Sequence, residues 1–274
     1  MRKFKENLLK ILLWLSAILT VSVLVGILGF IFLKGYKHIS LDFITKNYSA
    51  SGNGGVLPMI VATLYTVFTS IIIATPIGVL AAVYLTEYAK QGKIVKIIRF
   101  STESLSGIPS IVYGLFGSIF FVVTLNLKYS LLSASLTVAI IILPVIIRTT
   151  EEALKSVPPS YKEASLGLGA TKFQTLYKVI LPSAIPGILV GIILSIGRVI
   201  GESAAILLTA GTVAKMPKGI MSSARTLTVQ AYLTTQEAGN IEEAAAVGIV
   251  LIIVILALNI LAKVISRKLS KANY

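Results

Sequence analysis

The sequence predicts an all-α integral membrane protein with six membrane-spanning helices and both termini on the cytoplasmic side. Of its 274 residues, 55% are hydrophobic and 13% are charged, and the mean hydropathy is +0.90. Soluble domains carry about 25% charged residues, and here the apolar residues also form long blocks. The chain has no cysteine, which excludes disulfides and thiolate metal sites, and we assign no role to the single histidine, His38.

Six apolar segments are each long enough to cross a hydrocarbon core, which takes about 20 helical residues. They are 11–33, 58–84, 97–123, 131–147, 184–210 and 244–265. The first exceeds the ~7–15 apolar residues of a secretory signal, so we expect a retained span. The predicted division of the chain is an N-terminal span with its outer segment at 1–57, a transmembrane domain at 58–265, and a cytoplasmic tail at 266–274.

The basic residues predict the orientation. With the N-terminus inside, 17 of the 25 Lys and Arg residues lie in cytoplasmic segments and 7 in outer segments, while Arg198 alone lies deep in a span. This bias fits the positive-inside rule. The net charge of +14 therefore reflects membrane topology, and we expect no nucleic-acid partner. The longest inner segment is 148–182, and the outer segment 211–243 is expected to be a polar loop.

The inner segment carries signals for two short helices with a hinge between them. Ser160 with Glu163 and Thr171 with Gln174 have the S/T-x-x-E/Q spacing of a capping box. Gly169, between the two pairs, suits the left-handed residue that follows a helix. We expect the first helix to end just before this glycine and the second to end before the next proline. An ordinary amphipathic loop on the inner membrane surface is the alternative interpretation.

The fifth span carries the two charges Arg198 and Glu202, and an ionisable residue within a span is by default a functional hypothesis. On a helix they share a sector of about 100° with small or apolar residues, and we expect that face to look into the bundle. The other members of the sector are Gly187, Gly191, Leu194, Gly201, Ala205 and Thr209. The functional interpretation is an anion site at Arg198 that Glu202 weakens enough for release. The alternative is a self-neutralising i,i+4 ion pair that holds helices together.

Small residues in the fifth and third spans predict close packing. Gly187 with Gly191 and Gly197 with Gly201 are small-xxx-small pairs, which let helices approach closely. In the third span, Gly107–Gly117 contains proline and glycine, which fit either a packing kink or a water-lined pathway. The fourth span ends at Arg148, where the positive-inside rule alone already explains an arginine.

The inner segment resembles the EAA loop of ATP-binding-cassette importer permeases. Glu163-Ala164-Ser165, Gly169 and Val179-Ile180-Leu181-Pro182 follow the pattern E-A-A-x3-G-x9-I-x-L-P, with Ser165 and Val179 as conservative departures. The resemblance implies the type I importer permease fold and docking of the short helix on a cytoplasmic ATPase. The coupling residues that it implies are Ser160, Glu163, Ala164, Gly169, Thr171, Leu181 and Pro182. The chain has no G-x4-G-K-[ST] sequence, so we expect no cofactor on it and ATP on the partner ATPase.

Further motifs resemble the PstA family of phosphate-transport permeases, from about residue 54 to residue 265. They are 54–58, 107–117, 147–154, the EAA loop and 197–204. The resemblance implies a non-catalytic permease of the prokaryotic cytoplasmic membrane that imports inorganic phosphate, with Arg148 and Arg198 as positive groups on the route. It implies four kinds of partner: a PstC-like second permease, a PstB-like ATPase dimer, a PstS-like extracytoplasmic binding protein, and membrane lipid.

Other functions remain open at this point. The nearest is the same class of permease carrying molybdate, sulfate or another solute. An ion-coupled secondary carrier would need no ATPase and would leave the doubly capped inner segment unexplained. A non-transporting membrane scaffold would tolerate loss of Arg198.

Overall fold

The computed structural model describes residues 2–49, 54–90 and 92–271, and in those residues it contains helices and no strand. The α-helices are α1 Arg2–Gly35, α2 Leu41–Thr45, α3 Leu57–Val83, α4 Lys93–Ser106, α5 Ser110–Gly117, α6 Leu131–Lys155, α7 Pro159–Gly167, α8 Lys172–Thr175, α9 Leu181–Gly201, α10 Ala204–Ala210, α11 Leu227–Gln236 and α12 Ile241–Lys271. Tyr36–His38 forms a 3₁₀ turn, and the π-helical turns are Tyr84–Tyr88, Ser118–Thr124 and Leu176–Ile180.

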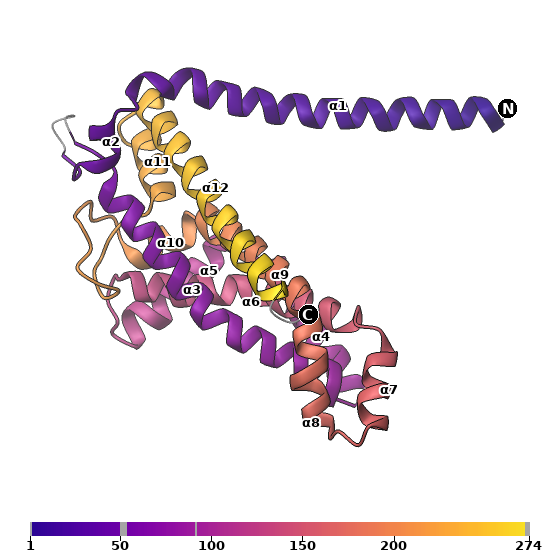
Figure 1. The fold of residues 1–274 in the computed structure, drawn as a ribbon. Coiled ribbons are helices and arrows are strands. Elements are labelled where there is room, and N and C mark those ends of the chain that lie inside the picture. The colour runs from indigo at the N-terminus through magenta and orange to yellow at the C-terminus, as the bar shows by residue number, and fades with distance from the viewer. Residues whose placement is uncertain (1, 50–53, 91, 272–274) are drawn as a thin grey trace.

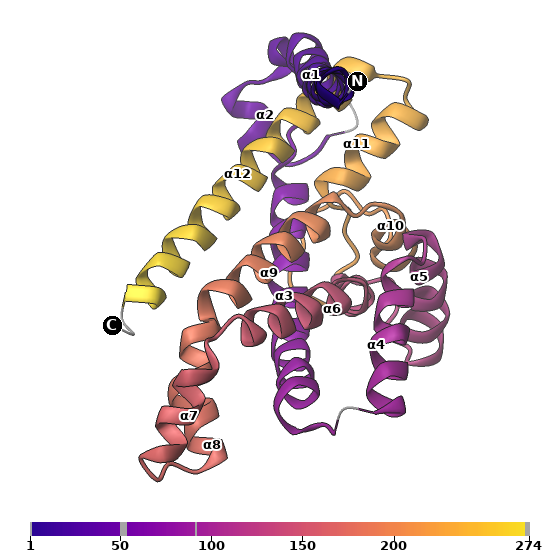
Figure 2. The same cartoon turned by 90° about the vertical axis from the view of Figure 1, so that its right-hand side faces the viewer.

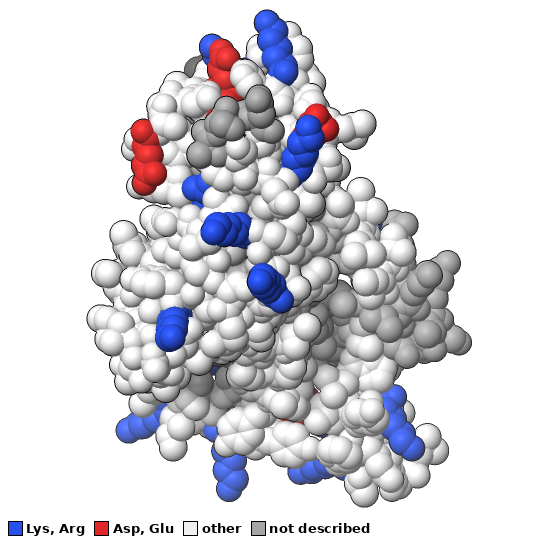
Figure 3. Space-filling view, turned by 90° about the vertical axis from the view of Figure 1, so that its left-hand side faces the viewer, with Lys and Arg blue, Asp and Glu red and all other residues white. Residues whose placement is uncertain are grey.

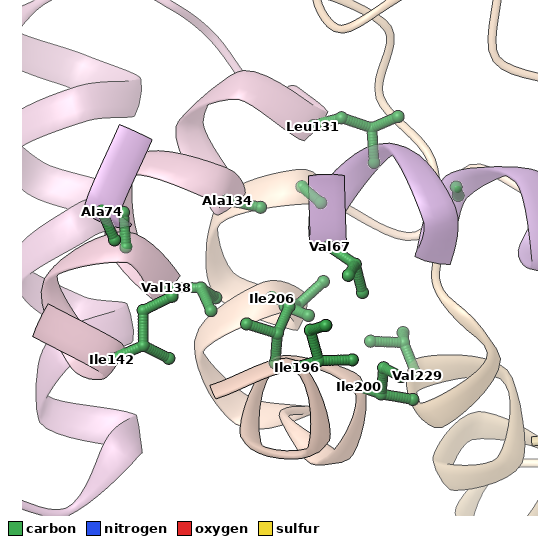
Figure 4. Packing of buried hydrophobic residues seen from close by; sticks show 14 of the residues in the cluster. Val67, Ala74, Leu131, Ala134, Val138, Ile142, Ile196, Ile200, Ile206 and Val229 are labelled. Atoms are coloured by element: carbon green, nitrogen blue, oxygen red, sulfur yellow. The ribbon is translucent and has the colours of Figure 1, made fainter. Parts of the chain in front are cut away.

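The transmembrane bundle is built around α6, which packs against α3 and α9 (Figures 1 and 2). A buried apolar cluster fills the space between these helices, α10 and α11, and Figure 4 shows its side chains converging. Its members include Val67, Ala74, Leu131, Val138, Ile142, Ile196, Ile200, Ile206 and Val229. Because lipid is as apolar as these side chains, such a bundle is held by close packing.

α1 lies apart from this bundle. It projects as an arm from the end of the molecule that carries α2 and α11 (Figure 1), and none of its most apolar stretch is buried. Among the described residues it packs on the rest of the chain near its C-terminal end, where Gly35 lies so close to the backbone of Ala245 that a Cβ would be 2.6 Å away. The first predicted span is therefore a helix, as expected, with its apolar surface uncovered by the described part of the chain.

Six spans were predicted, and the described residues contain five helical stretches long and apolar enough to cross a membrane. The third predicted span is represented by α4 and α5, which bend by 99° at their junction and make a sixth span if the pair is counted as one. Pro109, which has no N–H, stands at the break, and the hydroxyl of Tyr113 donates to the carbonyl oxygen of Leu105 across it at 2.7 Å. The third predicted span, 97–123, is therefore not one straight helix, and it bends within the Gly107–Gly117 segment.

The glycines of this third span serve packing. A Cβ at Gly114 would lie 2.8 Å from Cα of Ala205 in α10, and one at Gly117 would lie 2.1 Å from Oγ1 of Thr137 in α6. Of the two interpretations offered for Gly107–Gly117, the packing kink is the one that these contacts support.

Two further boundaries differ from the predictions. α6 continues to Lys155, so Arg148 lies within a helix and does not end it. The outer segment 211–243 contains α11, whose residues Leu227, Val229 and Leu233 are buried. The N–H of Leu227 donates to Thr63 Oγ1 of α3 at 3.0 Å, so this part of the segment belongs to the core and is not the polar loop expected.

Charged side chains are distributed unevenly between the two ends of the molecule. On the face in Figure 3, the visible acidic residues gather at the upper end, where Figure 1 places α2 and α11. Lys and Arg extend down this face and predominate at the lower end, where α7 and α8 lie.

Candidate functional site

Arg148 lines a cavity of about 430 Å³ between α4 and α6. Its side chain is 70% exposed, and its Nε lies 3.3 Å from Oε1 of Glu152, one turn along α6. Its NH1 lies 3.9 Å from Oε1 of Glu103 on α4. Arg148 is therefore accessible to an anion, and the two carboxylates beside it would compete with that anion.

A buried carboxylate lines the same cavity. Glu151, with a side chain 9% exposed, lies 3.0 Å from the guanidinium of Arg99 on α4 and 3.1 Å from Nζ of Lys155. Removing one partner of such a pair is costly, because it leaves the other charge away from water without its counter-charge. The pair with Arg99 thus ties α4 to α6 beside Arg148.

The alternative interpretation of Arg198 and Glu202, an i,i+4 pair on one helix, is not supported, because the two residues do not lie on one continuous helix. α9 ends at Gly201, and Glu202 has an extended backbone with ψ 128°. Its carboxylate Oε1 accepts the N–H of Ala205 at 3.2 Å, and its carbonyl accepts the hydroxyl of Thr228 at 2.8 Å. The fifth predicted span therefore breaks here, and the buried Glu202 side chain satisfies a backbone N–H in the first turn of α10.

Arg198 is exposed on the surface of this chain within the membrane-spanning part. A charged side chain that faces lipid is costly, so this surface requires a water-filled path or another subunit over it.

The predicted glycine face of α9 divides into two parts. A Cβ at Gly187 would lie 2.5 Å from Cβ of Ala153, and one at Gly191 would lie 2.0 Å from Oγ1 of Thr149. These two glycines therefore bring α9 against α6, as expected. A Cβ at Gly197 or Gly201 would meet no atom within 4 Å, so this pair makes no close helix contact within the described chain.

The first predicted capping box is wrong and the second is confirmed. α7 begins at Pro159 with Pro158 as its N-cap and no side-chain cap, so Ser160 already lies inside the helix. Proline is pre-organised for the first helical position, which Pro159 takes, so the helix starts two residues earlier than predicted. At α8, Thr171 and Gln174 make both capping hydrogen bonds, at 3.2 and 2.9 Å.

The hinge between α7 and α8 has the predicted geometry. Gly169 has φ +85°, a conformation that costs a residue with a Cβ about 1–2 kcal/mol. Across the hinge, the hydroxyls of Ser165 and Thr175 lie 2.9 Å apart. Ser165 stands where the EAA pattern has alanine, so this departure adds a hydrogen bond that joins α7 to α8.

The second short helix does not end before Pro182. α8, the π-helical turn Leu176–Ile180 and α9 form one continuous helical stretch from Lys172 to Gly201. In the π turn, the N–H of Leu181 donates to the carbonyl of Leu176, and Pro182 follows in the first turn of α9. Proline is tolerated there because its missing N–H is not required. Leu181 and Pro182 are half-buried at this junction.

α7 presents one face outward. Ser160, Glu163, Ala164 and Gly167 are all exposed and follow the i, i+3, i+4, i+7 spacing of one helical face. Around the hinge, Leu168 is 90% exposed and Phe173 is 66% exposed. A loop with this much uncovered apolar surface is typical of a protein-binding site.

A membrane bundle with an exposed helical loop at one end and an arginine on its spanning surface defines a class, the transport subunit that works within a larger assembly. The chain belongs to the family described as binding-protein-dependent transport system inner membrane component, whose model matches residues 74–271. It is thus a multi-pass inner membrane permease subunit. Its family works with a binding protein and with a separate ATPase, so this chain is not itself an enzyme.

Individual relatives agree with this assignment. The chain is 36% identical over 280 residues to the probable ABC transporter permease protein YqgI of Bacillus subtilis, covering 96% of this chain and 95% of that one. It is 37% identical over 211 residues to the phosphate transport system permease protein PstA of Pasteurella multocida, covering 76% and 75%. A chain of a crystallised bacterial alginate ABC transporter has the same fold, with a TM-score of 0.67 at 18% identity over 98% and 95% of the two chains.

The contacts that sequence reasoning missed join residues far apart in the chain. Glu103 beside Arg148 and Glu151 beside Arg99 depend on the packing of α4 on α6, which no local pattern reveals. Glu87 and Lys162 form a third such pair. These contacts could have been suspected from the acidic residues at the ends of predicted spans, because the positive-inside rule explains basic residues there and not acidic ones.

Proposed function

We propose that this chain forms half of a pore that imports inorganic phosphate, driven by a separate ATPase. Relatives of 34–37% identity carry the name of phosphate transport system permease PstA. The proposed partners are a PstC-like second permease, a PstB-like ATPase dimer and a PstS-like binding protein.

The observation that carries the proposal is the exposure of Arg198 within the membrane-spanning part. A second permease packed over this face would enclose the arginine, and the open space beside Gly197 and Gly201 would allow a close approach. Enclosed in this way, the guanidinium would attract a dianion. Glu202 is held in the turn before α10 at a fixed position, where we propose that its charge limits the affinity of the site.

Arg148 is proposed as a second positive group, on the same route. It lies in an open cavity and is neutralised in part by Glu103 and Glu152. An arginine with two carboxylate neighbours binds an anion weakly, which suits release. We place this end of the path on the cytoplasmic side, because α7 and α8 lie at the same end of the molecule as the predominance of Lys and Arg.

We propose that the exposed face of α7 docks on the ATPase. Ser160, Glu163 and Ala164 would make the contact. The remaining predicted coupling residues would set its geometry: Gly169 as the hinge, Thr171 as the cap of α8, and Leu181 with Pro182 as the junction to α9. In this way a movement of the docked loop would reach the bundle as a rigid displacement.

The decisive experiment measures phosphate uptake in vesicles that contain all partner subunits and the Arg198→Gln variant. Uptake should fall about tenfold or more, which corresponds to a loss of ~1.4 kcal/mol of anion stabilisation. Lys93→Gln, which removes an exposed charge outside the cavity, is the matched control and should leave uptake unchanged. Undiminished uptake by Arg198→Gln would refute the anion site, and equal inhibition by sulfate or molybdate would refute the choice of phosphate.

Docking is tested separately. Glu163→Lys should weaken co-purification of the ATPase, whereas Lys178→Glu, a charge reversal of similar size elsewhere on the loop, should not. If Glu163→Lys retains the ATPase fully, the docking face has been assigned wrongly.

A further inference from the structure

The inner end of α3 is joined to α7 by an ion pair that spans 75 positions of sequence. Nζ of Lys162 donates to Oε2 of Glu87, which belongs to the π-helical turn that continues α3. The Glu87 side chain is only 15% exposed and that of Lys162 is 44% exposed. Because the carboxylate is largely removed from water, its charge favours keeping this partner.

α7 has few other attachments to the bundle. The helix contains no buried residue. Two side-chain hydrogen bonds join it to other elements in the part of the chain that the structure describes, one from Lys162 to Glu87 and one between Ser165 and Thr175. Lys162 and Ser165 are three residues apart and so share one face. α7 is thus held on its inner face by polar contacts, opposite the face that carries Glu163.

α3 leads from this ion pair directly to the segment of α6 that carries Arg148. A Cβ at Gly78 of α3 would lie 2.7 Å from Cγ2 of Ile146, so the two helices are in close contact there. On the other side, Gly191 of α9 presses on Thr149. Residues 146–149 of α6 are therefore held between α3 and α9, and helices packed this closely move together.

The junction has room to rearrange. A cavity of about 170 Å³ lies between α3, α7 and α8, lined by Glu87, Lys162, Leu166, Lys172, Thr175 and Leu176. π-helical turns flank it, at Tyr84–Tyr88 and Leu176–Ile180. Such turns are frequent at functional sites in helices. The contact between α7 and the end of α3 is therefore an ion pair beside a cavity. It differs from the close packing of α3 on α6 at Gly78.

We propose that the Lys162–Glu87 pair is a second coupling contact, which transmits displacement of α7 to α3 alongside the continuous path from α8 into α9. The proposal rests on the proposed function, in which α7 docks on the ATPase. With both contacts intact, α3 and α9 move the Arg148 segment of α6 from its two sides. With the pair broken, displacement of α7 reaches the bundle through α9 alone. Each cycle of ATP hydrolysis then displaces residues 146–149 of α6 less completely.

The experiment uses the full transporter in vesicles and measures three quantities: ATPase co-purification, ATP hydrolysis, and phosphate transported per ATP hydrolysed. Glu87→Gln is the primary variant, because Glu87 lies on α3 and not on the docking face. Lys162→Met removes the other partner, and the double exchange Glu87→Lys with Lys162→Glu restores the pair with reversed charges. Lys172→Met removes a positive charge that lines the same cavity and serves as the control.

Glu87→Gln and Lys162→Met should each lower phosphate transported per ATP about fivefold, equivalent to ~1 kcal/mol at 1.4 kcal/mol per factor of ten. Assembly should persist, the double exchange should recover most of the loss, and Lys172→Met should match the wild type. An unchanged ratio in Glu87→Gln overturns the proposal, and so does a double exchange no better than the single variants. Loss of ATPase association in Glu87→Gln also overturns it, because the pair would then support docking. Failure of the wild-type transporter to take up phosphate would refute the proposed function instead.

Discussion

The close contact of α9 with α6 at Gly191 gives a prediction with a magnitude fixed by geometry. In Gly191→Ala, the new Cβ would lie 2.0 Å from Oγ1 and 2.9 Å from Cβ of Thr149. Rotation of the threonine can move its hydroxyl but cannot move its Cβ, so the two helices must separate by a few tenths of an ångström or more. Overpacking of this kind costs about 1–3 kcal/mol.

The expected result is a lower melting temperature of the purified chain. For a chain of this size, 2 kcal/mol corresponds to roughly 4–8 °C. Thermal stability in detergent, followed by the loss of the monodisperse peak in size-exclusion chromatography, measures it. Gly191→Ala combined with Thr149→Ala should recover part of the loss, since the hydroxyl contact is removed. Gly197→Ala, on the same helix in open space, is the matched control and should be neutral or slightly stabilising. If Gly191→Ala and the wild type have the same melting temperature, the contact between these helices is not as close as the structure shows.

Three further variants test local features. Thr171→Ala removes the confirmed cap of α8 and should destabilise that helix by about 1 kcal/mol. The measured result should be faster proteolysis of the loop in the purified chain. Ser160→Ala removes no capping hydrogen bond and should leave the cleavage rate unchanged. Glu202→Ala should destabilise the chain by about 1–3 kcal/mol, because the buried N–H of Ala205 loses its acceptor. Glu202→Gln retains an acceptor oxygen, so its melting temperature should be close to that of the wild type. Equal losses of melting temperature in both variants would contradict this role. Glu151→Gln removes the ion pair of Glu151 with Arg99 and should cost about 1–2 kcal/mol, discounted for the partial exposure of the arginine. High salt should lower the stability of the wild type more than that of the variant, and an identical salt response would exclude the ion pair as the cause.

Much of the fold could be predicted because membrane insertion imposes a strong local requirement. Each span must supply its own apolar length and its own backbone hydrogen bonds, so hydropathy located the apolar helices but not the bend in the third span or the end of the fifth. The confirmed cap at Thr171 and the left-handed Gly169 are equally local, since a few neighbouring residues determine them.

The errors occurred where tertiary contacts override local preference. Glu202 leaves the helical path because its carboxylate finds the N–H of Ala205 and its carbonyl finds Thr228, a residue 26 positions away. α11 is buried because α3 offers Thr63 to its first N–H, although its composition resembles a loop. Ser160 failed as a cap because the preceding proline already fits the first helical position. The proposed site depends on the packing of α4 against α6 around Arg148. This packing could not be predicted from the sequence, because it joins residues far apart in the chain.

The isolated position of α1 has a consequence for how the chain is made. The apolar stretch of α1 packs on nothing in the described part of the chain, so its insertion into a membrane does not require the bundle to be folded first. Its attachment at Gly35 then acts as a fixed pivot for the rest of the polypeptide. Apolar-to-apolar exchanges along this stretch therefore leave the packing of the bundle within this chain unchanged.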